Sequence, residues 1–127
     1  PTVIQNPFEK VDYEPISNTW IKFNEADMDL SIQTKHLLLA YCSDYNVLAT
    51  SLLPHASKAH FGNTQVASLD HSIWFHRNTD LNDWILINVE SPSASNTRGF
   101  NKGSIFNRSG ELICSVTQEG LMRPIKK

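Results

Sequence analysis

The sequence predicts an α+β domain in which one long helix lies against a single curved antiparallel sheet. Two patterns predict it: an apolar-periodic run in residues 31–53 and a series of closely spaced strand-like segments after residue 64. The connections between those segments are too short to hold crossover helices, so the strands are expected to pair antiparallel. A single sheet with only one helix must bury one face on that helix, and we therefore expect the sheet to curl around it.

The predicted helix covers residues 31–53 and would be about 35 Å long. Apolar residues recur in it at three- and four-residue steps, as one side of a helix requires, and the run contains no Gly or Pro. Several side-chain oxygens upstream can cap its N-terminus, and Pro54 ends it. The periodic apolar residues are Leu37, Leu38, Tyr41, Val47, Leu48 and Leu52, and the candidate caps are Asn24, Asp27, Asp29 and Ser31.

Asp44 is a carboxylate within the apolar flank of this helix, since Tyr41 and Val47 lie at helical spacing on either side of it. Burial of a carboxylate is costly unless the group is paired or hydrogen-bonded. Two interpretations follow from the helix alone. Asp44 either marks the edge of the apolar stripe and reaches water or caps a neighbouring segment, or it is a buried group kept for a function.

Strand-like segments precede and follow the predicted helix in the sequence. Residues 19–23 alternate in polarity and predict a strand before the helix, whereas residues 1–17 predict an extended arm with a short strand near residues 11–13. Polar clusters and a Gly-containing turn separate the later strands. Those strands are predicted at residues 65–76, 83–90, 98–106 and 111–119, with turns at residues 77–80, 91–93 and 107–110.

The alternation within two strands assigns side chains to faces. In the last strand, Gln118 continues the apolar phase of Cys114 and Val116, whereas Glu119 points to solvent. The Gln118 amide must therefore find partners, either in the interior or on the backbone at a frayed strand end. In residues 65–76, His71 falls in the apolar phase and is expected to be a hydrogen-bonded structural residue. The core phase there is Ala67, Leu69, His71, Ile73 and Phe75. Asp70 points to the opposite face from His71, so the two cannot form a charge relay.

Composition excludes several classes of function. The chain has 127 residues, a net charge of −2 and no basic run, so nucleic-acid binding is not indicated, and it has no apolar stretch long enough for a membrane span. Cys42 and Cys114 lack metal-type spacing and predict buried, reduced thiols, and the histidines show no zinc spacing. No Gly-x-Ser-x-Gly elbow is present. Because the chain has no secretory signal, we expect an intracellular protein.

Four blocks of the sequence resemble one family. They are Ala40-Tyr41-Cys42-Ser43-Asp44-Tyr45-Asn46, Ala67-Ser68-Leu69-Asp70-His71-Ser72-Ile73-Trp74-Phe75-His76-Arg77, Glu90-Ser91-Pro92-Ser93-Ala94 with Arg98-Gly99-Phe100, and Gln118-Glu119-Gly120-Leu121-Met122-Arg123. Their order and spacing resemble those of the acyl-CoA thioesterase II (TesB-like) family, whose members have two hotdog units in tandem. Four blocks in register make this a far more specific match than any single tetrapeptide.

The resemblance implies a hotdog fold, in which a curved antiparallel sheet wraps a long helix, and hydrolysis of fatty acyl-CoA to free fatty acid and CoA. It implies that Asp44, Ser68 and Gln118 are the catalytic residues and together hold the attacking water. Asp70, His71, Trp74 and Arg98 also match the family, and we expect them to serve the fold and the pocket wall. No metal and no cofactor are implied, because CoA is part of the substrate.

The chain differs from the family pattern in holding one hotdog unit, which resembles the C-terminal one. Residues 1–17 are then an inter-unit linker and residues 18–127 the single hotdog domain, whose partner is a second hotdog unit in tandem or in a homodimer. Two alternatives stay open: a non-catalytic acyl-CoA-binding or assembly module, and another hotdog enzyme such as an enoyl-CoA hydratase. By resemblance the compartment is peroxisomal in a eukaryote and cytoplasmic in a bacterium.

Overall fold

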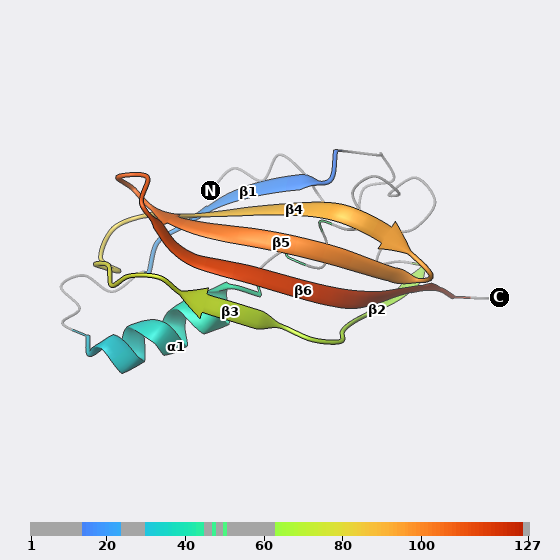
Figure 1. Ribbon diagram of the computed structural model, residues 1–127, viewed down its shortest axis with the longest axis horizontal. Helices are drawn as coiled ribbons and strands as arrows, with labels where there is room; N and C mark the ends of the chain where they lie inside the picture. The colour runs from blue at the N-terminus through green and yellow to red at the C-terminus, as the bar shows by residue number, and fades with distance from the viewer. Residues whose placement is uncertain (1–13, 24–29, 45–46, 48–49, 51–62, 126–127) are drawn as a thin grey trace.

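A computed structural model describes residues 14–23, 30–44, 47, 50 and 63–125. It confirms the predicted α+β class, with one helix beside a curved antiparallel sheet (Figure 1). The strands run in the order β1-β4-β5-β6-β2, and β3 also pairs with β6. The elements are β1 (Ile16–Ile21), α1 (Ile32–Cys42), β2 (Thr64–Ser68), β3 (Ser72–Phe75), β4 (Ile85–Ser95), β5 (Arg98–Asn107) and β6 (Leu112–Pro124). β1 begins within the predicted arm, and the short strand predicted near residues 11–13 lies outside the described residues.

Helix α1 begins as predicted but ends earlier. Ser31 is the N-cap, and its hydroxyl oxygen accepts a hydrogen bond from the Thr34 backbone N–H at 3.2 Å. The predicted continuation through residue 53 is wrong at residues 43–44, which form a turn. The Ser43 hydroxyl donates to the Ala40 carbonyl at 2.7 Å, and this is the carbonyl that the Asp44 N–H would use in a continuing helix. Helical backbone is found again at Val47 and Thr50, which are both buried.

The core lies between one side of α1 and the concave face of the sheet. Leu39 and Cys42 of the helix are buried there, but Leu37 and Tyr41 are 71% and 84% exposed. The predicted apolar stripe is therefore wrong at these two positions, because α1 turns a neighbouring face to the sheet. The buried apolar residues of this core are Leu39, Cys42, Val47, Leu81, Ile85, Ile87, Val89, Ile105, Ile113, Cys114 and Val116.

The hairpin between β4 and β5 is longer than predicted. Residues 91–93 were expected to end the strand, yet β4 continues to Ser95 and absorbs them in a register shift between Glu90 and Ser93. The chain then reverses through Asn96 and Thr97, whose φ angles are 53° and 61°. Two adjacent left-handed residues are typical of a type I′ hairpin turn, here without the usual glycine.

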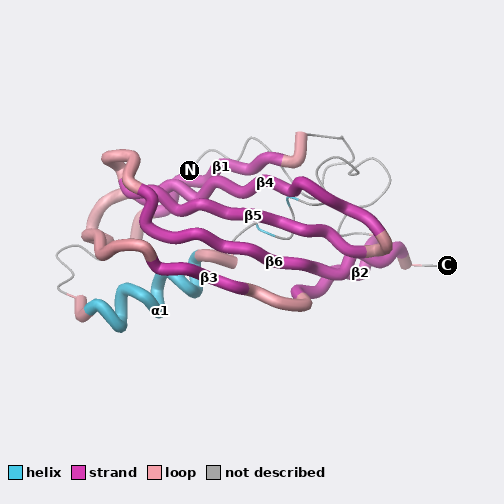
Figure 2. The backbone as a smooth tube through the Cα atoms, in the orientation of Figure 1, coloured by secondary structure: helices cyan, strands magenta, loops and turns pink. Residues whose placement is uncertain are grey.

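The segment predicted as one strand over residues 65–76 is two strands, β2 and β3, separated at residues 69–71 (Figure 2). Ser68 pairs with Gly120 and Ser72 pairs with Thr117, so three residues of this segment face two residues of β6. The extra residue changes the side-chain phase between β2 and β3. This irregularity is what positions the candidate site.

Candidate functional site

Gln118 is the centre of the candidate site. It lies on β6, is 0% exposed, and faces the concave side of the sheet as its predicted phase requires. Its Nε2 donates to the Ser68 Oγ at 2.6 Å, and its Oε1 lies 2.6 Å from the Nδ1 of His71. Both ends of a buried amide are thus hydrogen-bonded, as its burial demands.

The break between β2 and β3 brings Ser68 and His71 to the same amide. In one unbroken strand these residues, three apart, would point to opposite faces of the sheet. The break is held in place by β6, because the Leu69 and Asp70 N–H groups both donate to the Glu119 carbonyl, at 2.9 and 3.4 Å. The Asp70 carboxylate in turn accepts from the Glu119 N–H at 2.9 Å.

The C-terminus of α1 also reaches this site. Ser43, the C-cap residue, is 0% exposed, and its Oγ lies 2.8 Å from the Nε2 of His71. Four side chains from β2, the β2–β3 break, β6 and α1 are therefore connected through hydrogen bonds. We call Ser43, Ser68, His71 and Gln118 the Gln118 network. The phase of Gln118 in its strand predicts that the amide has a partner, but sequence patterns indicate neither Ser43 nor the contact with His71.

Asp44 directly follows Ser43 in the turn after α1, and its side chain is exposed. Among the residues that the structure describes, its carboxylate has no hydrogen-bond partner. Of the two interpretations of Asp44, a residue at the edge of the apolar stripe that reaches water agrees with the structure, and a buried carboxylate does not, because α1 ends at Cys42, two residues before Asp44. The structure joins Ser68 and Gln118 directly and places Asp44 next to the network through the backbone of Ser43.

The other residues of the predicted strand over residues 65–76 lie on β2, on β3 and in the break between them. His71 does face the helix side with Ile73 and Phe75, and the Phe75 ring stacks on His36 of α1 at 4.1 Å. Ile73 is partly buried against the core, but the other members of this predicted core phase are exposed, because β2 and β3 lie at the edge of the sheet. Leu69, Trp74 and Phe75 are 49%, 51% and 36% exposed, and Ala67 and His71 are exposed as well.

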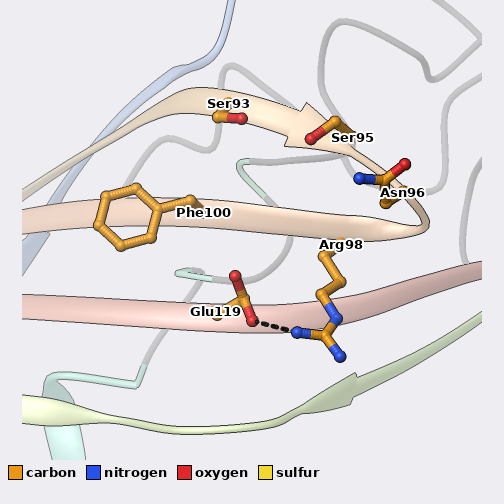
Figure 3. A pocket seen from close by; sticks show the side chains of 6 residues that line it. All are labelled: Ser93, Ser95, Asn96, Arg98, Phe100 and Glu119. Carbon is orange, nitrogen blue, oxygen red and sulfur yellow. Dashed lines mark hydrogen bonds and ion pairs between the residues drawn. The ribbon is translucent and has the colours of Figure 1, made fainter.

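The outer face of the sheet carries a separate polar pocket of about 360 Å³ (Figure 3). Arg98 of β5 and Glu119 of β6 form an ion pair there at 3.0 Å, so Glu119 points away from Gln118 as predicted. The pocket is lined by Ser93, Ser95, Asn96, Arg98, Phe100 and Glu119. Arg98 thus lines a wall on the face opposite to the Gln118 network.

The cysteines contribute no nucleophile near neutral pH. Cys42 and Cys114 are free and buried, as predicted. Burial raises the pKa of the Cys42 thiol, and it raises the pKa of the Cys114 thiol to about 11. Within the described part of the chain, no group of three or more His, Cys, Asp or Glu side chains could hold a metal ion. No helix among those residues is long and apolar enough to cross a membrane.

A curved antiparallel sheet packed on one helix is the architecture of the hotdog fold. A sequence model of the acyl-CoA thioesterase family matches residues 2–121. Acyl-CoA thioesterase 2 of Haemophilus influenzae is 42% identical over 121 residues, and acyl-coenzyme A thioesterase 8 of Mus musculus is 38% identical over 110. The crystal structure of acyl-CoA thioesterase II TesB2 from Mycobacterium marinum is similar with a TM-score of 0.79 and 36% identity.

These comparisons show that the chain belongs to the acyl-CoA thioesterase family. The matches cover 94%, 87% and 86% of this chain, in the same order. They cover only 42%, 34% and 42% of the three longer proteins. The chain therefore spans less than half the length of the relatives it matches.

Proposed function

We propose that this chain is the catalytic hotdog unit of an acyl-CoA thioesterase, which hydrolyses fatty acyl-CoA to free fatty acid and CoA. The observation that carries the proposal is the 2.6 Å hydrogen bond between Gln118 and Ser68, in a chain of this family. A buried amide and a hydroxyl side by side can orient one water molecule through directed hydrogen bonds.

In the proposed reaction, Asp44 is the general base. Its carboxylate takes a proton from the water, the water oxygen adds to the thioester carbonyl carbon, and the C–S bond breaks as CoA leaves as a thiolate. The thiolate then takes up a proton. Ser68 and Gln118 orient the water, and no covalent serine intermediate is formed. The exposed position of Asp44 in the turn after α1 keeps its carboxylate accessible to a substrate that arrives from solvent.

We further propose that a second hotdog unit completes the acyl pocket, either in tandem or as a second copy of this chain. Two observations support a partner: the greater length of the relatives, and apolar side chains left exposed on α1 and along β2 and β3. β3 pairs with β6 on one side only among the described strands, and an open strand edge is a site for further pairing. The exposed residues are Leu37, Tyr41, Leu69, Trp74 and Phe75.

The proposal is tested by measuring CoA release with a thiol reagent across acyl chain lengths. Asp44→Asn keeps the shape of the side chain but removes its basicity, so kcat should fall by about 100-fold or more. The matched control is Asp83→Asn, which alters an exposed carboxylate paired with Arg108 at 3.4 Å and should leave kcat unchanged.

Three other results would contradict the proposal. Full turnover by Asp44→Asn would remove Asp44 as the base. Binding of acyl-CoA without CoA release, in a sample shown by light scattering to contain paired units, would favour the non-catalytic module. Addition of water across an enoyl-CoA double bond would favour the hydratase. The compartment stays a prediction, peroxisomal in a eukaryote and cytoplasmic in a bacterium, and fractionation of the source cells tests it.

A further inference from the structure

His71 links Gln118 to Ser43, because each of its two ring nitrogens has a hydrogen-bond partner in the Gln118 network. Its Nδ1 contacts the Gln118 Oε1 at 2.6 Å, and its Nε2 contacts the Ser43 Oγ at 2.8 Å. We propose that His71 is a positioning residue that sets which end of the Gln118 amide faces Ser68. Its effect on turnover rests on the proposed thioesterase function, whereas its effect on the amide does not.

The orientation follows from what each atom can donate or accept. The Gln118 Oε1 is a carbonyl oxygen and only accepts, so the Nδ1 of His71 must carry the proton of that bond. The Ser43 hydroxyl donates its single proton to the Ala40 carbonyl, so its Oγ accepts from the Nε2 of His71, and both ring nitrogens donate. The NH₂ end of the amide is then directed to the Ser68 Oγ, which accepts from it. Two donors are left over, the Ser68 hydroxyl proton and the second N–H of Gln118, and both can bind the oxygen of one water molecule.

Without the Nδ1 donor of His71, nothing in the Gln118 network would fix which end of the Gln118 amide faces Ser68. The last torsion of a Gln side chain is broad and roughly two-fold, so the amide can exchange its oxygen and nitrogen ends by rotation. In the exchanged state the carbonyl oxygen would face Ser68 and take its hydroxyl proton. The site would then present one donor fewer to the water, and the attacking oxygen would be held less well.

The ring of His71 is itself held from two directions. The β2–β3 break that carries it is hydrogen-bonded to the Glu119 backbone, next to Gln118 in β6. On the other side, Ser43 connects the ring to the end of α1, directly before Asp44. His71 therefore aligns the water-binding amide on the sheet with the helix terminus that carries the proposed base.

Two nearly isosteric variants separate the two ring nitrogens. His71→Asn places an amide N–H close to the Nδ1 position and keeps the donor to Gln118, whereas His71→Gln reaches the Nε2 position and keeps only the contact with Ser43. We expect His71→Asn to retain kcat within about 5-fold, and His71→Gln to lose about 10- to 100-fold with little change in KM. The control is His76→Gln, since His76 binds Ser115 at 2.8 Å outside the network and should leave kcat unchanged. Thermal unfolding confirms that each variant is folded.

A second readout needs no turnover. Long-range ¹H–¹⁵N spectra of the full chain report which ring nitrogen of His71 is protonated, and the Gln118 side-chain amide protons report their exchange with solvent. We expect a proton on Nδ1, and slow exchange of the Gln118 amide in wild type and His71→Asn but not in His71→Gln. A neutral ring with its proton on Nε2 alone, or equal kcat values in the two variants, would overturn the proposal. If the wild type releases no CoA, the proposed function fails, and the spectra still decide the role of His71.

Discussion

The buried thiol of Cys114 should make the domain lose stability at alkaline pH. Cys114 lies in β6 and is 0% exposed, and burial raises its pKa from 9.0 to about 11. In the unfolded chain the thiol ionises near its ordinary pKa, while in the folded protein it stays neutral. The unfolded state therefore binds fewer protons than the folded state between these two pKa values, and stability falls as the pH rises through that interval.

The size of the effect follows from the two pKa values. Each pKa unit corresponds to about 1.4 kcal/mol, so the full loss is about 3 kcal/mol, reached above pH 11. About 2 kcal/mol of it should be present at pH 10.5. Below pH 8 the thiol is protonated in both states and contributes no pH dependence.

Urea unfolding of wild type and Cys114→Ala between pH 7.5 and 10.5 measures this loss. At pH 7.5 the variant should be less stable, because the smaller side chain leaves a cavity in the core. The difference in unfolding free energy between the two proteins should shrink by about 2 kcal/mol at pH 10.5. Val116→Ala is the matched control, since Val116 is buried in the same strand but does not titrate, and its cost should not change with pH. A Cys114→Ala profile that stays parallel to wild type would refute the reasoning.

Three further predictions concern stability. Ile105→Ala should lower the free energy of unfolding by about 2–5 kcal/mol, because Ile105 is 0% exposed. Ile16→Ala, at a 39% exposed position, should cost less. Equal costs of the two variants in urea unfolding would contradict the assignment of Ile105 to the core. Thr97→Gly should raise the melting temperature and add about 0.5–1 kcal/mol, because a β-branched residue is strained at a φ of 61°; a lower melting temperature would refute it. Arg98→Gln removes an exposed ion pair with Glu119 and should cost less than about 1 kcal/mol, with a smaller cost in high salt; a large cost that is insensitive to salt would count against a surface role.

The parts of the fold that the sequence predicts well are those governed by local periodicity. β6 alternates regularly from Cys114 to Gln118, so the inward amide could be recognised from its phase alone. The turn at residues 107–110 also formed as predicted, since Gly110 has a φ of 89° and its N–H donates to the Asn107 carbonyl at 3.0 Å. Both features depend on neighbours a few residues away.

The features that local patterns missed depend on contacts between distant segments. The β2–β3 break is fixed by hydrogen bonds to Glu119, about fifty positions later in the sequence, and neither Gly nor Pro marks it. The same break reverses the phase that separated Ser68 from His71, so the Gln118 network could not be derived from alternation. The end of α1 at Cys42 depends on a serine side chain that binds both its own helix and His71. The exposure of Leu37 and Tyr41 could not be predicted either, because the helical period shows an apolar side of the helix but not which part of that side meets the sheet.

A single turnover in ¹⁸O-labelled water tests the central claim most directly, namely that a water held by Ser68 and Gln118 attacks the thioester with Asp44 as base. Enzyme is mixed with a smaller amount of acyl-CoA. Mass spectrometry then follows the released fatty acid and the peptides that carry Asp44 and Ser68. We expect one ¹⁸O atom in the fatty acid of the first turnover, an unlabelled Asp44 and no acyl group on Ser68. Label in the Asp44 carboxylate with an unlabelled fatty acid, or an acyl group on Ser68, would contradict it.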